Sequence, residues 1–285
     1  MMTIAPADTP LASFQTKWMA ARPELGLALN FVAACDRPAQ SAFACLRLEL
    51  EHTAFGIREA QPAATKLQWW AEELARAGNG EARHPLTQAL ATHRAFSGVP
   101  LRDWYAVISG ALTQRDSEPA SDRRALLEGY HALYQPLAQI EALLFAPLDA
   151  TAVAQVNALA RALRETAVLG EALRDGRLPL PLDLLARHRL ARGDIARSSP
   201  AQIAALREWL AELATDMAAP VHSGAQLGPL HAAAASVDRW RARKAEVAVD
   251  PLPALDRLLT RLPLQTAWVA WRAGRRSVRP PKARH

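Results

Sequence analysis

The spacing of apolar residues constrains the fold of this chain more than any other feature. Apolar side chains recur every three or four positions along almost the whole sequence. In the segment 62–77, for example, Leu67, Trp70 and Leu74 fall at positions i, i+3 and i+7. This period is typical of an amphipathic helix, and the alternation of β-branched and polar residues expected of strands is nearly absent. The sequence therefore predicts an all-α protein.

Clusters of Pro and Gly separate the expected helices and are spread evenly, without an internal repeat. Even spacing favours one helical domain over two. We expect that domain over residues 22–274, an N-terminal extension over 1–21 and a basic tail over 275–285. Besides 62–77, the expected helices lie near residues 23–34, 38–56, 84–95, 101–113, 121–145, 151–174, 200–218, 226–247 and 252–273.

Composition excludes several classes of protein. A chain of 285 residues can bury a sizeable core without disulfides. No run approaches the roughly 18 apolar residues that span a bilayer, and residues 1–10 lack the basic start and apolar block of a secretory signal. We therefore expect a cytoplasmic protein in which Cys35 and Cys45 are reduced, buried thiols.

The net charge of +6 is concentrated at the C-terminus. Six positive residues and no Asp or Glu follow Trp271, and they are Arg272, Arg275, Arg276, Arg279, Lys282 and Arg284. Such a tail is either solvated or attracted to an anionic partner, for which a membrane surface is our expectation and nucleic acid is not. A second basic and aromatic stretch that could contact a membrane comprises Arg239, Trp240, Arg241, Arg243 and Lys244.

Two stretches resemble a known family. Residues 64–74 read A-T-K-L-Q-W-W-A-E-E-L and are followed by R-H-P-L at 83–86, and residues 173–185 read L-R-D-G-R-L-P-L-P-L-D-L-L. They resemble the K-L-x-W-W-x-E-E-L, r-H-P-v and L-R-D … G-R-x-Y-L-P-x-d-L-L landmarks of the squalene/phytoene synthase family. The resemblance covers roughly residues 22–192. It implies an all-α bundle of the isoprenoid synthase type around a central cavity, in a family of terpenoid biosynthesis whose active members join two prenyl diphosphates head to head with magnesium.

The first acidic motif of that family is depleted in this chain. A departing diphosphate needs hard cations, which bind oxygen ligands. The family pattern R-x-x-D-D-x-x-D corresponds to residues 47–54, where Arg47 keeps the arginine and Glu51 alone keeps a carboxylate. Leu50 and Ala54 stand at the other two aspartate positions. One carboxylate is too few to hold magnesium.

The second acidic motif is depleted as well. Val168 and Glu171 replace the family's glutamine and asparagine, whereas Asp175 is retained. Gly176 and Arg177 follow at once, so the later acidic pair is missing. Glu51, Glu171 and Asp175 are therefore vestigial catalytic candidates, and we expect no metal or other cofactor.

Two further departures from the family pattern agree with the depletion of the acidic motifs. Gln114 and Arg115 stand where the family has an aspartate, and Pro136 follows Tyr130 where small residues line the cavity. We expect Pro136 to bend or end its helix and to narrow the pocket. The retained packing landmarks and the lost acidic groups together favour a protein that kept the fold and lost the reaction.

Several basic side chains remain near the position where the family binds a diphosphate. They suggest that this chain binds an anion directly, without magnesium. The expected ligand-binding residues are Arg47, Arg58, Lys66, Arg174, Arg177 and Tyr130. Simpler interpretations exist for several of them. Arg47 and Glu51 can form an exposed ion pair, charges near Asp175 can be solvated, and Trp69 and Trp70 can serve core packing.

Three functions follow from these alternatives. The leading hypothesis is a catalytically degenerate protein that binds an isoprenoid diphosphate, another lipid or a protein partner, as an assembly or scaffold factor. The rival is an active magnesium-dependent prenyltransferase that draws on Glu51, Glu171, Asp175 and Asp183. The third is a membrane-surface adaptor that acts through the basic tail, which would make a cytoplasmic protein peripheral to a membrane.

Overall fold

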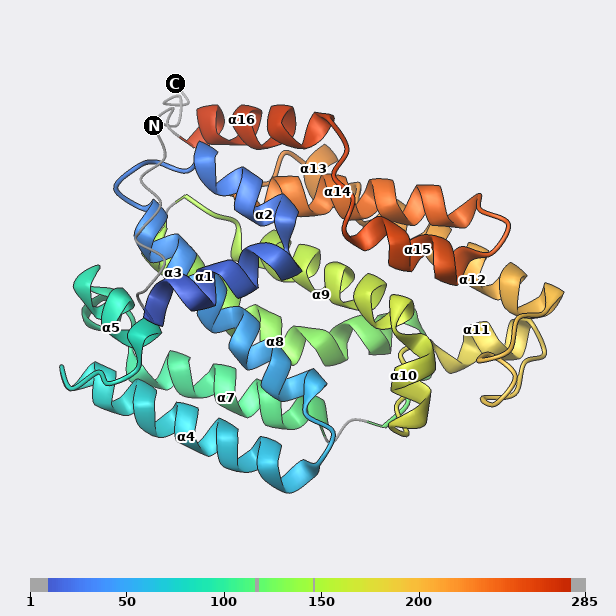
Figure 1. Ribbon diagram of the computed structural model, residues 1–285, viewed down its shortest axis with the longest axis horizontal. Coiled ribbons are helices and arrows are strands. Elements are labelled where there is room, and N and C mark those ends of the chain that lie inside the picture. The colour runs from blue at the N-terminus through green and yellow to red at the C-terminus, as the bar shows by residue number, and fades with distance from the viewer. Residues whose placement is uncertain (1–9, 116–117, 146, 278–285) are drawn as a thin grey trace.

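A computed structural model describes residues 10–115, 118–145 and 147–277 of the chain (Figure 1). Within these residues every regular element is a helix, which confirms the all-α prediction. The elements are α1 (Pro10–Ala21), α2 (Pro23–Ala28), the 3₁₀ turn η1 (Leu29–Phe31), α3 (Arg37–Glu51), the π-helical turn η2 (His52–Gly56), α4 (Ala60–Gly78), α5 (Pro85–Thr92), α6 (Ala95–Gly98), α7 (Leu101–Arg115), α8 (Arg123–Leu144), α9 (Ala150–Ala167), α10 (Leu169–Arg174), α11 (Leu182–Arg187), α12 (Pro200–Asp216), α13 (Ala219–His222), α14 (Gly228–Glu246), α15 (Pro251–Leu259) and α16 (Gln265–Ser277).

The long central helices begin at capping side chains that the sequence supplies. The carboxylates of Asp122 and Asp149 accept hydrogen bonds from backbone amides in the first turns of α8 and α9, and the hydroxyl of Ser199 does so for α12. Each cap satisfies an amide that has no partner within its own helix.

In Figure 1, α3, α8 and α9 cross the middle of the molecule, with α4 and α7 on one side and α14 and α16 on the other. The α7–α8 contact is close because Gly110 has no side chain. A Cβ added there would overlap the carbonyl oxygen of Ala132 and lie 2.6 Å from its carbonyl carbon. These two helices therefore pack backbone against backbone.

The side chains of α4 confirm the apolar pattern. Leu67, Trp70 and Leu74 are fully buried in the core, whereas Trp69 is 39% exposed. Adjacent residues point about 100° apart on a helix. The tryptophan pair therefore contributes one ring to the core, as the core-packing interpretation expects.

The helices bear on two sequence expectations, and of the two outcomes expected at Pro136 an end of the helix is wrong. α8 does not end at Pro136 but continues to Leu144. Burial of Leu133 and Leu137 on either side of the proline compensates for the lost hydrogen bond. Residues 10–21, expected within an N-terminal extension, form α1, whose Trp18 is buried in the core.

The two cysteines differ in environment. Cys45 is buried in α3, and burial raises the pKa of its thiol to about 12. Cys35 is exposed, which corrects the expectation that both are buried, because it lies in the turn between η1 and α3.

Of the expected basic tail over 275–285, residues 275–277 belong to α16 and residues 278–285 lie outside the described part. No described helix combines the length and apolar character needed to cross a bilayer.

Candidate functional site

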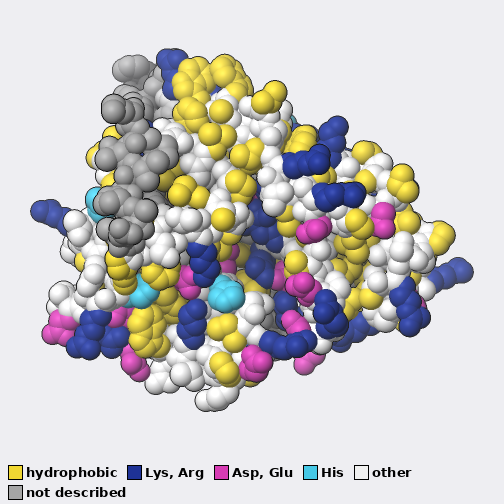
Figure 2. Space-filling model, viewed as in Figure 1, with side chains coloured by type: hydrophobic (Ala, Val, Ile, Leu, Met, Phe, Trp, Pro, Cys, Tyr) yellow, Lys and Arg dark blue, Asp and Glu magenta, His cyan; other side chains and the backbone are white. Residues whose placement is uncertain are grey.

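A cavity of about 360 Å³ opens where η2, the end of α7, α8, α9 and the loop after α10 meet. We call it the mouth. It brings together four residues that the sequence singles out, Arg58, Tyr130, Asp175 and Arg177. In Figure 2, Lys or Arg side chains and Asp or Glu side chains alternate around a hollow near the end of α3 and α10. Part of the mouth is apolar, and that part includes Phe55, Leu126, Leu178 and Pro179.

Two carboxylates at the mouth, Asp175 and Glu165, are bound to arginines. Arg58 forms an ion pair with Asp175. Nη1 of Arg177 lies 2.7 Å from Oε2 of the buried Glu165, and Arg161, one turn earlier on α9, pairs with the other oxygen of Glu165. Glu165 therefore lies between two guanidinium groups, which neutralise its charge.

Arg115, which the motif comparison places where the family has an aspartate, has a structural role here. Its Nη1 donates hydrogen bonds to the carbonyl oxygens of Thr53 (3.1 Å) and Ile57 (2.8 Å). These carbonyls lie at the end of the α3–η2 segment, where backbone oxygens lack partners within the helix. Arg115 thus attaches α7 to the turn that follows the first motif.

Tyr130 is buried beside the mouth. Its ring packs edge-on against Phe55, with 5.9 Å between the ring centroids. Burial raises the pKa of the phenol to about 12, although Arg161 and Arg177 oppose this shift. The hydroxyl therefore remains protonated at neutral pH and can donate a hydrogen bond.

Arg47 lies deeper, in the centre of the bundle. Nη1 of Arg47 donates to Oδ1 of Asn157 (3.3 Å), and ion pairs connect Arg47 with Glu51 (3.6 Å) and Glu141 (3.9 Å). Burial raises the pKa of Glu141, but His231 and Arg47 outweigh burial, so the pKa is lowered overall. The Arg47–Glu51 pair is buried, which corrects the interpretation of it as an exposed pair.

Other expected ligand-binding residues lie away from the mouth. Nζ of Lys66 pairs with Glu49 at 3.3 Å, and Lys17 binds the same carboxylate at 2.6 Å. Arg174 is exposed, and its Nε donates to the carbonyl oxygen of Gly170 at 3.1 Å. Of the six expected residues, the mouth therefore unites Arg58, Tyr130 and Arg177.

The acidic candidates of the two motifs do not converge. Glu51 is bound to Arg47, Asp175 is bound to Arg58, and Glu171 is exposed on α10. Asp183 pairs with Arg187 at 2.6 Å on α11. In the part of the chain that the structure describes, no group of three His, Cys, Asp or Glu side chains is placed to hold a metal ion.

Sequence reasoning missed Glu165, although its spacing of i, i+4 from Arg161 is visible in the sequence. It also assigned Arg241 to a basic surface. Arg241 is instead fully buried and binds Asp238 (2.6 Å) and Glu24 (3.1 Å), because it points inward from α14 toward α2.

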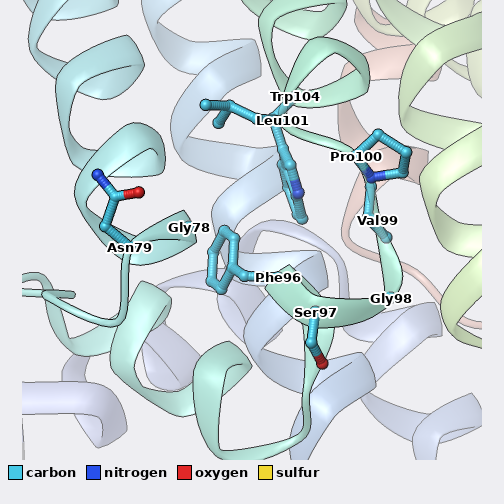
Figure 3. A pocket seen from close by; sticks show the side chains of 9 residues that line it. All are labelled: Gly78, Asn79, Phe96, Ser97, Gly98, Val99, Pro100, Leu101 and Trp104. Atoms are coloured by element: carbon cyan, nitrogen blue, oxygen red, sulfur yellow. The ribbon is translucent and has the colours of Figure 1, made fainter.

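A second cavity, of about 380 Å³, lies between the end of α4 and the start of α7 (Figure 3). Phe96 and Trp104 line it, with 5.1 Å between their ring centroids, and its polar side chains are Asn79 and Ser97. Because no titratable side chain is among the residues that line it, this cavity offers no side-chain acid or base.

Comparison with known proteins agrees with the fold and the motifs. The profile of the squalene/phytoene synthase family matches residues 37–272, and the chain belongs to this family. The structure is similar to squalene synthase HpnC from Alicyclobacillus acidocaldarius, with a TM-score of 0.55 and 17% identity over 97% of this chain and 98% of that one. It is also similar to a dehydrosqualene synthase in complex with ligand, with a TM-score of 0.63 and 12% identity over 87% of this chain and 94% of that one. No curated protein matches the sequence.

Proposed function

We propose that this protein is a non-catalytic member of its family that binds one anionic isoprenoid or other phosphate-bearing lipid at the mouth. The observation that carries the proposal is the pairing of motif carboxylates with arginines: Glu51 with Arg47, and Asp175 with Arg58. Magnesium requires several oxygen ligands in a near-octahedral arrangement. Isolated carboxylates that already bind guanidinium groups do not fit that requirement.

Two arginines of the mouth are accessible to a ligand. The side chains of Arg58 and Arg177 are 61% and 41% exposed. A phosphate can replace Asp175 on Arg58, because that carboxylate lies in a surface loop. Glu165 keeps its pair with Arg161 when Arg177 turns to the ligand. Guanidinium groups bind phosphate oxygens through two parallel hydrogen bonds, which gives both affinity and orientation.

The volume of the mouth favours one bound molecule. Ligand pockets usually measure about 300–1,000 Å³, and the mouth, at about 360 Å³, lies near the lower limit. It can hold one headgroup and part of an apolar chain beside Phe55 and Leu178. Head-to-head condensation requires two prenyl chains, so this volume supports binding rather than synthesis.

Calorimetric titration of the full chain with farnesyl diphosphate tests the proposal, with and without magnesium. We expect heat at a stoichiometry of one in both conditions, and no release of pyrophosphate. Arg58→Ala and Arg177→Ala should each weaken binding about tenfold or more, because each removes a charge-assisted contact. Arg174→Ala is the matched control, since that exposed arginine lies three residues from Arg177 and outside the mouth.

Each alternative has its own outcome in this experiment. Magnesium-dependent release of pyrophosphate would establish an active prenyltransferase and overturn the proposal. An absence of heat in both conditions would exclude an isoprenoid diphosphate as the ligand and favour a protein partner. A role at a membrane surface in the cytoplasm is a second candidate, and the exposed tryptophans of α16 support it.

A further inference from the structure

A groove of about 730 Å³ lies between α14 and α16, at the opposite side of the bundle from α4 and α7. Its apolar lining includes Leu227, Ala232, Ala235, Val269 and Ala273. Four arginines also border it, and they are Arg239, Arg243, Arg272 and Arg276. None of the described residues that line this groove is Asp or Glu. The groove therefore combines an apolar interior with a positively charged rim.

The outer face of α16 carries exposed tryptophans. The spacing of three and then four residues places Trp268, Trp271 and Arg275 on one side of the helix. Trp268 is 59% exposed, and its ring centroid lies 4.7 Å from that of Trp271. The guanidinium of Arg275 lies over the Trp271 ring, 5.2 Å from its centroid. Figure 2 shows hydrophobic side chains gathered over α16 at the top of the view.

The opposite face of α16 holds the helix in place. Thr266 and Ala270 are fully buried, and Gly274 lies against η1. A Cβ on Gly274 would lie 2.5 Å from the carbonyl oxygen of Phe31. Because this close contact fixes the rotation of α16, its tryptophans cannot turn into the core. Exposed aromatic groups of this size, next to an apolar groove, indicate an interaction surface.

The charges on this surface have few partners within the chain. Arg243 pairs with Glu246 at 3.0 Å. No carboxylate within the described ranges forms an ion pair with Arg239, Arg272 or Arg276. The sequence contains no Asp or Glu after Asp256. The mouth differs, because there the arginines are matched by acids.

We propose that α16 and the groove beside it form a docking surface for an anionic lipid bilayer. Trp268 and Trp271 lie at the level of the headgroups, where amphipathic rings are favoured, and the rim arginines bind lipid phosphates. The groove receives the apolar tail of one lipid. A helix with an apolar aromatic side and a basic side lies in the membrane plane in this way.

Charge and shape favour a bilayer over other partners. A second copy of this chain would present the same positive surface, so like charges would oppose its docking. A nucleic acid would satisfy the arginines but leave the apolar groove exposed to water. A bilayer with anionic headgroups satisfies both parts at once. This surface is separate from the mouth, so variants at Arg58 and Arg177 leave it intact.

Vesicle flotation of the full chain tests the proposal. The probes are vesicles of phosphatidylcholine alone and of phosphatidylcholine with one third phosphatidylglycerol, each also prepared with brominated chains that quench nearby tryptophans. We expect flotation with the anionic vesicles only, weakening as salt is raised, together with quenching. The double variant Arg272→Gln/Arg276→Gln should bind about tenfold more weakly or worse. The double variant Trp268→Ser/Trp271→Ser should lose most of the quenching.

Two controls test whether α16 itself makes the contact with the membrane. Tyr105→Ser with Arg102→Gln changes an exposed aromatic and an exposed cation on α7, and flotation should be unchanged. A chain that ends at Ser277 should keep its tryptophan quenching, because the contact resides in α16. The proposal is overturned by any of three results: no flotation, binding to duplex DNA in its place, or a dimer without lipid that shields Trp268 and Trp271.

Discussion

Glu73 allows a quantitative test of what the retained W-W-x-E-E-L landmark does. Its Oε1 accepts hydrogen bonds from the backbone amides of Arg83 and His84, both at 2.8 Å, and from the hydroxyl of Thr87 at 2.5 Å. Its Oε2 accepts a hydrogen bond from Arg76 at 3.1 Å. The carboxylate is fully buried. It therefore ties α4 to the R-H-P turn that starts α5, and we predict that the landmark is structural.

The size of this contribution follows from the pKa. Burial raises the pKa of Glu73, but the hydrogen bonds from His84, Thr87, Arg83 and Arg76 outweigh burial and lower it from 4.5 to about 2. A group with a lowered pKa stabilises the folded state above its unfolded-state pKa and loses that effect as the pH falls toward the folded-state value. The ionised form therefore contributes about 3 kcal/mol at neutral pH. Roughly half of this is left near pH 3.

Glu73→Gln keeps the shape of the side chain and removes its charge. Urea unfolding followed by circular dichroism should show a free energy of unfolding about 2–3 kcal/mol lower than in the unaltered protein at neutral pH. The difference should shrink steadily below pH 4.5, because the unfolded chain then takes up a proton at Glu73 while the folded protein stays ionised there until about pH 2. Glu72→Gln is the control, since the neighbouring carboxylate is exposed and its pair with Arg76 is long, at 3.9 Å. A loss below about 1 kcal/mol, or one that is constant down to pH 3, would refute this reasoning.

Further predictions concern packing and buried charge. Gly110→Ala should destabilise the protein by about 2 kcal/mol through overpacking, whereas Gly129→Ala, with open space around its Cβ, should stabilise it by about 0.5–1 kcal/mol in urea unfolding. Shifts in the same direction would contradict the close α7–α8 contact. Iodoacetamide at mildly alkaline pH should modify Cys35 alone in the folded protein and also Cys45 after unfolding, as mass spectrometry can show. Arg241→Met should cost about 3 kcal/mol, because two buried carboxylates, Glu24 and Asp238, lose the guanidinium that they share and keep only their weaker links to Arg164 and Arg22, and an unchanged melting temperature would exclude this role.

The helices and the region of the mouth are accessible to sequence reasoning because both depend on local spacing. The positions of Leu67, Trp70 and Leu74 on one face follow from the helical period alone. The motif comparison likewise singles out Asp175 and Arg177, which the structure places at the mouth.

The remaining contacts depend on how distant helices pack. His231 lies 90 positions from Glu141 in the sequence, and Arg241 lies 217 positions from Glu24. Spacing along one helix reports only neighbours on that helix, so no local pattern relates these partners. The same holds for Arg115, whose acceptors lie on another segment of the chain.

The proposed function, in which arginines occupy the place of metal charge, has a consequence for how such a protein could gain a metal. Guanidinium groups are protonated at every physiological pH and cannot dissociate from the chain as an ion can. Restoring an aspartate at Ala54 alone would add one acid to a site where Arg115 and Arg161 remain in place. On that proposal, a metal site would require coordinated changes on η2, α7 and α9.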